Sequence, residues 1–210
     1  MEKSSEEDNL LDDVEIEFSI KHSNDDAIAQ YVLEFEGRAQ AWDDEEAADV
    51  QVGTITGWRV DLSTAQYDQI DLRELFDSVS SELSDFYHTM MPDDQCILPE
   101  TENRLHEEKE CECLVYISQL VVDTAYRSRG LGSALLRKMG AMIDVTDCLV
   151  ALKAFPLADE LGKKAEAADI ARIKHFYRKH DFKHAEGEFM IKDARLCEAV
   201  KKRLARRMKK

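Results

Sequence analysis

The sequence predicts an α/β fold, and two observations carry this prediction. Over residues 113–192 the pattern runs strand, helix, strand, helix, strand, and the segments at 113–122 and 148–154 are largely apolar, like strands inside a sheet. The strands that flank the first of these helices are expected to be parallel. With 210 residues, of which 44% are hydrophobic and 8% aromatic, the chain can bury a sizeable core, which excludes a wholly disordered protein.

The first half of the chain predicts strands followed by one helix. Alternating polarity or a β-rich composition indicates the strands, and apolar residues at helical spacing indicate the helix. Strands are predicted at 14–20, 31–35 and 50–62, a long amphipathic helix at 72–90, and loops at 43–49 and 91–112. Gly53 and Gly57 in the third strand are candidate bulges.

The second half continues the alternation toward a basic end. Strands are predicted at 113–122, 148–154, 182–184 and 188–192, helices at 131–143 and 167–180, and a polar turn at 123–129. In the domain organisation that follows, residues 1–13 form a flexible acidic tail, 14–193 form one domain, and 194–210 form a basic C-terminal helix.

Apolar runs and cysteine spacing favour a cytoplasmic protein. No apolar run approaches the roughly 18 residues of a membrane span, and the N-terminus is acidic rather than basic and then apolar, so neither a membrane span nor a secretory signal is predicted. The five cysteines show no zinc-like spacing. All five are therefore expected to be reduced, and no metal is expected.

The net charge of −16 is distributed unevenly along the chain. Residues 1–112 carry 7 Lys/Arg against 32 Asp/Glu, a net charge of −25, and residues 113–210 carry 21 against 12, a net charge of +9. This asymmetry argues against simple coating of nucleic acid and favours a cationic partner for the acidic half. The alternative is that the acidic residues only keep the protein soluble.

The segment Arg127-Ser-Arg-Gly-Leu-Gly-Ser133 is the main candidate for a binding site, because it joins a buried strand to a helix. Its two glycines permit a positive φ and close approach of the backbone, the helix N-terminus offers N–H groups and a positive dipole end, and two arginines lie beside it. These features are typical of a phosphate or pyrophosphate site.

Two common phosphate motifs do not fit this segment. A P-loop needs a lysine after the glycines, and none is present. A Rossmann fingerprint needs a small residue where Leu135 stands and glycines directly after the strand. An ordinary glycine-rich turn remains the structural alternative.

The surrounding residues resemble a known family. Leu120–Leu136 resembles the acetyl-CoA-binding segment of the GCN5-related N-acetyltransferase (GNAT) family, whose loop reads Gln/Arg-x-x-Gly-x-Gly/Ala, and Phe176–Phe182 is similar to its helix-end pattern. The resemblance covers residues 113–192 and is weak over 14–91. It implies a GNAT-like fold, with a central mixed twisted sheet flanked by helices, and acetyl-CoA as co-substrate.

The resemblance also implies roles for particular residues. The backbone of Leu120, Val121 and Val122 would pair with the pantetheine amides, and a backbone N–H near Val122 would stabilise the oxyanion. The pyrophosphate would be held by the loop and the start of the helix, namely Arg127, Ser128, Arg129, Gly130, Leu131, Gly132 and Ser133. Tyr177 would act as the catalytic acid that protonates the leaving thiolate.

Three residues depart from the family pattern. Thr124 replaces a common proline, Ile170 stands where many members have an asparagine, and Asp181 replaces the usual glycine at the helix end. Aspartate enters the left-handed region more easily than most residues, so the turn is expected to survive at Asp181. The asparagine contact with the cofactor is the one that Ile170 puts in doubt.

Each candidate also has a structural interpretation. Tyr177 is alternatively a packing residue on the helix face with Ile170 and Ile173, Arg129 a solvated charge, and Arg127 a partner for a neighbouring carboxylate. Tyr116 and Ser118 line either an acceptor pocket or the core. The general base is not identified, although Glu112 acting through water is a weak candidate, and the six histidines form no triad or metal spacing.

The sequence therefore predicts an N-acetyltransferase that moves acetyl from acetyl-CoA to a primary amine, on a small molecule or a peptide, with a cationic acceptor favoured by the acidic half. Two alternatives remain open: a non-catalytic module that binds CoA or acyl-CoA, and a toxin that acetylates aminoacyl-tRNA. Nucleic-acid binding by the basic tail is the less favoured interpretation, no membrane partner is expected, and a homodimer is allowed.

Overall fold

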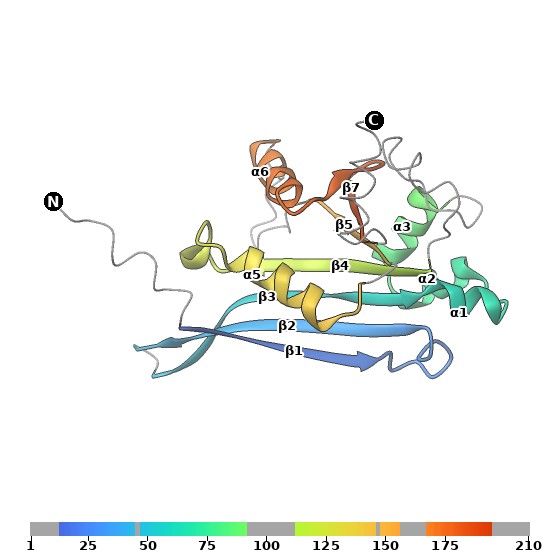
Figure 1. The fold of residues 1–210 in the computed structure, drawn as a ribbon, viewed down its shortest axis with the longest axis horizontal. Coiled ribbons are helices and arrows are strands. Elements are labelled where there is room, and N and C mark those ends of the chain that lie inside the picture. Colours follow the sequence, from blue (N-terminus) through green and yellow to red (C-terminus); the bar gives the residue numbers. More distant parts are fainter. Residues whose placement is uncertain (1–12, 45–46, 92–111, 146–147, 156–166, 195–210) are drawn as a thin grey trace, which may run out of the picture. The chain divides into compact units, whose positions relative to one another are not determined.

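The computed structural model describes residues 13–44, 47–91, 112–145, 148–155 and 167–194. Its strands form one mixed seven-stranded sheet flanked by helices, in the order β1-β2-β3-β4-β5-β7-β6 (Figure 1). The predicted α/β class, a central mixed sheet flanked by helices, is confirmed. Within the described residues, no helix has the length and apolar character needed to cross a membrane.

The strands and helices follow the predicted order closely. They are β1 (Val14–His22), β2 (Val32–Asp43), β3 (Ala48–Asp61), α1 (Leu62–Tyr67), α2 (Leu72–Val79), α3 (Ser81–Met90), β4 (Cys113–Val122), the 3₁₀ turn η2 (Thr124–Tyr126), α5 (Leu131–Met142), β5 (Cys148–Lys153), α6 (Ala167–Arg178), β6 (Lys183–His184) and β7 (Phe189–Asp193). All seven predicted strands are present, and β2 runs further than predicted. The predicted tail at 1–13, the loop at 91–112 and the basic helix at 194–210 fall almost entirely outside the described residues.

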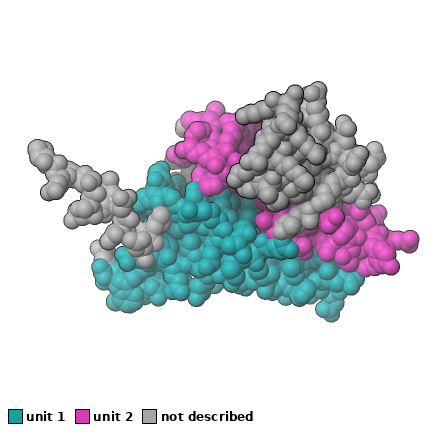
Figure 2. All heavy atoms as spheres, in the orientation of Figure 1, with its two compact units in different colours: residues 1–58, 117–144 teal, residues 59–116, 145–210 magenta. Residues whose placement is uncertain are grey.

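The chain divides into two compact units, coloured separately in Figure 2. Unit 1 comprises Met1–Trp58 and Ile117–Asp144, and unit 2 comprises Arg59–Tyr116 and Val145–Lys210. The boundary passes through β3 and β4, so each unit holds part of both strands.

Unit 1 is built on a long antiparallel hairpin whose apolar face packs against α5. The β1–β2 register is unbroken from Val14 opposite Ala41 to His22 opposite Leu33. Alternation along β1 places its apolar side chains on one face and its charged side chains on the other. On the apolar face the ring of Phe18 lies over Gly37, where a Cβ would overlap the ring and lie 2.8 Å from Ile55 Cγ2.

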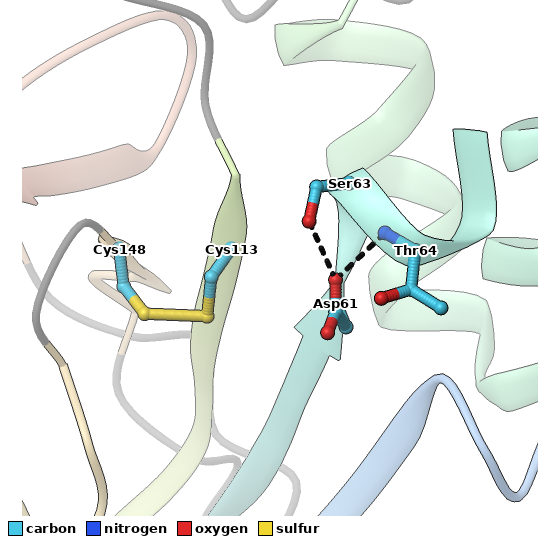
Figure 3. Close-up of a disulfide and its surroundings, with 5 residues drawn as sticks. All are labelled: Asp61, Ser63, Thr64, Cys113 and Cys148. Atoms are coloured by element: carbon cyan, nitrogen blue, oxygen red, sulfur yellow. Dashed lines mark hydrogen bonds between the residues drawn. A yellow bond between two sulfur atoms is a disulfide. The ribbon is translucent and has the colours of Figure 1, made fainter. Parts of the chain in front are cut away.

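Unit 2 contains a disulfide that the sequence did not predict. Cys113, the first residue of β4, is bonded to Cys148, the first residue of β5, and their Cα atoms lie 4.4 Å apart (Figure 3). The expectation that all five cysteines are reduced is therefore wrong for this pair. The reason is that β4 and β5 are neighbours in the sheet and their first residues lie side by side.

The start of α1 is fixed beside this disulfide. Asp61 Oδ1 accepts hydrogen bonds from Thr64 N at 2.9 Å and from Ser63 Oγ at 3.0 Å (Figure 3). The carbonyl of Glu112, directly before Cys113, accepts from the N–H groups of Leu62 and Ser63 at 3.0 and 3.1 Å. Burial opposes ionisation of Asp61, but its hydrogen bonds from Thr64 and Ser63 together hold its pKa below the usual value.

The long helix predicted at 72–90 is two helices, α2 and α3, and this prediction is corrected. Ser80 between them has an extended backbone, with φ −167° and ψ 157°, and its side chain accepts a hydrogen bond from Leu83 N at 3.1 Å. Serine is a preferred N-cap, so the chain ends one helix and starts the next at this residue. The apolar spacing continues across the break, which is why periodicity alone suggested one helix.

The core of unit 2 contains an aromatic cluster that joins α3 to β4 and β7. Phe86 is fully buried and makes edge contacts with Tyr116 at 5.6 Å and Phe189 at 5.4 Å between ring centroids. β7 pairs antiparallel with both β5 and β6. The predicted turn after α6 is confirmed, since Asp181 adopts a left-handed backbone with φ 67°.

Candidate functional site

The loop after β4 is fixed to the sheet at its first residue. Asp123 N–H donates to the carbonyl of Val52 in β3 at 2.9 Å. The Asp123 side chain accepts from Ala125 N at 2.8 Å and so caps the 3₁₀ turn η2. The polar turn predicted here is thus a structured connection that is hydrogen-bonded to β3 at its first residue.

Arg127 is held by the strand that precedes it. Its Nε donates to the carbonyl of Val122 at 2.9 Å, and the side chain is exposed. The sequence predicts a phosphate or a carboxylate as the partner of Arg127. In the structure, its Nε donates to a backbone carbonyl instead. Among the described residues its Nη atoms have no hydrogen-bond partner, so the charged end of the guanidinium is available to an anion.

Ser128 and Gly130 turn the chain into α5. Both have left-handed backbones, with φ 63° and 95°. Gly130 is the N-cap of α5 and has no side chain to bond the first turn of N–H groups. Gly132 lies inside α5 without a positive φ, so only the first of the two loop glycines uses that conformation. The helix therefore presents an N-terminus with no side-chain cap from its N-cap residue.

Packing holds this helix end against the sheet. Leu131 and Leu135 are buried, and a Cβ on Gly53 would lie 3.3 Å from the Cδ atoms of both and from the carbonyl oxygen of Val121. Gly53, predicted as a candidate bulge, is thus a point of close approach between β3 and α5. Because the Leu131 side chain is in the core, only its backbone can contribute to a ligand site.

The charges around the start of α5 favour an anion. The first turn of α5 contains no acidic residue, and Arg127 and Arg129 are exposed just before it. The helix dipole adds a positive end at the same place. Uncapped N–H groups, a dipole and two arginines together have the chemistry of a phosphate site.

Tyr177 lies in unit 2, on α6, and is 8% exposed. Its ring makes edge contacts with Phe176 and Phe182, with centroids 5.1 and 5.6 Å apart. Burial raises the pKa of its hydroxyl. The hydroxyl has no hydrogen-bond partner within the described ranges, so the ring is positioned by packing alone.

The other predicted acceptor-side residues differ in burial. Tyr116 is 1% exposed and packs against Phe86, and burial, together with Glu82 and Asp85, raises its pKa. It is a core residue. Ser118 is half-buried in unit 1, and Glu112 is exposed and uses its carbonyl to hold α1.

A charged group at the end of β5 was not predicted. Lys153 Nζ lies 2.8 Å from Asp85 Oδ2, 4.0 Å from Glu188 Oε2 and 5.7 Å from the centre of the Phe189 ring. The hydrogen bond with Asp85 is the main cause of its raised pKa, to which the carboxylates of Glu82 and Glu188 add. The only signal in the sequence was a lysine at the end of an apolar strand, which does not indicate its partners.

Comparison with known proteins decides the family of the loop-bearing segment. Residues 96–184 match the model of the acetyltransferase (GNAT) domain. This segment belongs to the GNAT family. The predicted family and the predicted enzyme class, an acyltransferase, are confirmed at this level. The predicted cofactor loop of the GNAT domain lies in unit 1 and the predicted acid Tyr177 in unit 2.

Solved structures show only a distant likeness to the chain. The chain is 16% identical to Arabidopsis thaliana NAA60 in complex with a bisubstrate analogue, over 84% of this chain and 98% of that one, with a TM-score of 0.38. It is 9% identical to a point mutant of KacT, over 88% and 98%, with a TM-score of 0.42. No curated protein sequence matches. The family assignment therefore rests on the match over residues 96–184.

Proposed function

We propose that this protein is an N-acetyltransferase that transfers acetyl from acetyl-CoA to a primary amine of a cationic acceptor. The observation that carries the proposal is the start of α5, an N-terminus without a side-chain cap beside two arginines, inside a segment of the GNAT family. A small molecule or a peptide amine is the proposed acceptor class.

The residues of the loop fit a pyrophosphate. The N–H groups of Leu131, Gly132 and Ser133 belong to the first turn of α5, where the N-cap supplies no acceptor. Arg129 and the Nη atoms of Arg127 would add charge-assisted hydrogen bonds. Ser128 and Gly130 serve by their left-handed backbones, which turn the chain into the helix. No acidic side chain in the first turn of α5 opposes the anion.

The pantetheine arm is assigned to the end of β4. β5 has six residues whereas β4 has ten, so strand length alone leaves four residues of β4 that cannot pair with β5. The backbone of Leu120 and Val121 is proposed to bond the pantetheine amides there. The carbonyl of Val122 already accepts from Arg127 Nε, so its N–H is the more suitable group, and we assign it to the oxyanion.

The chemistry is a direct transfer. The acceptor amine attacks the thioester carbonyl, the C–N bond forms, the C–S bond breaks, and the amine loses a proton to solvent while the thiolate gains one. Tyr177 is the proposed donor of that proton. The acceptor is proposed to be cationic because residues 1–112 carry a net charge of −25.

The deciding experiment measures free thiol release from acetyl-CoA with a panel of amines, beside the affinity for CoA in calorimetry. The panel contains polyamines, aminoglycosides, peptides with a free N-terminus or lysine, and aminoacyl-tRNA. Turnover with a cationic amine, reduced by added salt through KM, is expected. CoA binding without thiol release for any amine would contradict the proposal and indicate a non-catalytic CoA-binding module, and turnover confined to aminoacyl-tRNA would indicate a toxin.

A further inference from the structure

The outer edge of the sheet in unit 1 is a long, regular strand. β1 is the last strand in the sheet order, and its outer side has no neighbouring strand in the part of the chain that the structure describes (Figure 1). The strand has nine residues, contains no proline, and keeps an unbroken register with β2. In an antiparallel ladder every second residue directs its N–H and C=O outward, so this edge offers a row of unpaired backbone groups.

Edge strands are normally protected against pairing with another chain. Protection comes from short length, proline, a bulge, charged side chains, or a covering loop or helix. β1 has none of the first three; it carries Glu15, Glu17 and Lys21 on one face, and its other face consists of Val14, Ile16, Phe18 and Ile20. Ile20 is 42% exposed although it is a large apolar residue. The length, unbroken register and apolar face of β1 would allow it to pair with another strand.

We propose that β1 pairs antiparallel with β1 of a second copy of this chain, with Phe18 opposite the partner's Phe18, which joins two sheets across a two-fold axis. In this register Ile16 lies opposite the partner's Ile20, so the apolar rows meet. Glu15 lies opposite the partner's Lys21, so opposite charges meet on the other face, where Lys21 also pairs with Glu34 of its own β2 at 3.0 Å. All nine residues of β1 find a partner.

Other two-fold registers of the same strand fit less well. Centring the pair on Glu17 places this carboxylate opposite its own copy and leaves His22 and Lys21 without a partner. Centring it on Ser19 leaves Val14 and Glu15 unpaired, although Glu17 then meets the partner's Lys21. The register centred on Phe18 is the one that pairs the whole strand without opposing like charges.

The first test uses sedimentation equilibrium of the full chain over a range of concentrations, at about 0.15 M salt to screen the net charge of −16. A monomer–dimer equilibrium is expected. Glu15→Lys should raise the dimer Kd roughly tenfold, because two symmetric attractive pairs become repulsive. Adding Lys21→Glu should restore the dimer, and Glu17→Lys, which faces the partner's Ser19, is the matched control with little effect on the dimer. Because Glu17 lies opposite Arg38 within its own chain, a circular dichroism melt verifies that this control folds.

The second test addresses the apolar row. Ile20→Lys should abolish dimerisation, while Met142→Lys on α5 should not, although both residues are nearly half exposed at 42% and 47%. Circular dichroism melts verify that both variants fold. A wild-type chain that stays monomeric at every concentration overturns the proposal, as does an Ile20→Lys variant that still forms dimers. A larger effect of Glu17→Lys than of Glu15→Lys overturns the proposed register.

Discussion

Replacing Gly130 with alanine tests the cofactor loop directly. The backbone of Gly130 has φ 95°, and an L-residue held in the left-handed region loses about 1–2 kcal/mol of stability. If the chain relaxes instead, φ changes sign and the peptide that carries the Leu131 N–H rotates away from the anion. The loss of one charge-assisted hydrogen bond, about 1.5–3 kcal/mol, corresponds to a rise of roughly 10- to 150-fold in the Kd for CoA.

The chain offers a matched control at Gly187, which has φ 59° and open space around its Cβ position. Gly187→Ala should lose comparable stability and keep its CoA affinity, because Gly187 belongs neither to the loop at 127–130 nor to α5. Calorimetric titration with CoA and urea unfolding of both variants separate strain from binding. The reasoning fails if Gly130→Ala binds CoA as the wild type does, or if both variants lose affinity equally.

Three further predictions concern the frame around the site. The Cys113–Cys148 disulfide links residues 35 apart in the sequence, and its reduction should lower the free energy of unfolding by about 4 kcal/mol in urea titrations. A variant with both cysteines changed to alanine should not respond to reductant. Ser80→Ala should cost about 1 kcal/mol of stability through loss of the α3 cap, and an unchanged urea midpoint would contradict that role. Gly53→Ala should weaken CoA binding, because its Cβ would press on Leu131 and Leu135 and displace the N-terminal turn of α5. Gly140→Ala is the control: Gly140 lies on α5 with open space at its Cβ position, so CoA binding should stay unchanged.

Local patterns in the sequence were sufficient for most strands and for the loop. The apolar run at 113–122 and the glycines before residue 133 are contiguous signals, and β4 and the start of α5 lie where they predict. The break at Ser80 was missed because apolar spacing continues through it, and only the extended backbone and the cap reveal it. A serine on the polar side of a helix gives no comparable signal in the sequence.

Long-range pairings could not be predicted in the same way. The Cys113–Cys148 disulfide depends on β4 and β5 being neighbours with their first residues adjacent, and nothing near either cysteine encodes that adjacency. Gly53 is predicted as a bulge because a glycine inside a strand often marks one, and the residues that it approaches, Leu131 and Leu135, are far away in the sequence. Arg127 was placed in the loop from the sequence, but its bond to the Val122 carbonyl depends on how the turn folds back.

Burial gives Tyr177 two properties with opposite effects on catalysis. Packing against Phe176 and Phe182 fixes the ring, which favours proton transfer by positioning. Burial also raises the pKa of the hydroxyl, which makes it a weaker acid and keeps it protonated as the pH rises through the usual tyrosine value of about 10. A loss of activity caused by ionisation of Tyr177 should therefore begin only above that pH.

The variant Tyr177→Phe keeps the shape of the ring and removes the proton donor. If Tyr177 protonates the thiolate, kcat should fall by roughly 10²–10⁴-fold at pH values where the wild-type hydroxyl is protonated, while the Kd for CoA and the melting temperature stay near those of the wild type. Tyr67→Phe is the matched control, because Tyr67 is 87% exposed in the same unit. If Tyr177→Phe turns over as fast as Tyr67→Phe, water supplies the proton and Tyr177 is a packing residue. Wild-type kcat could instead decline with rising pH already before a pH of about 10, with no such decline in Tyr177→Phe. In that case the hydroxyl is catalytic but the argument that burial raises its pKa is wrong.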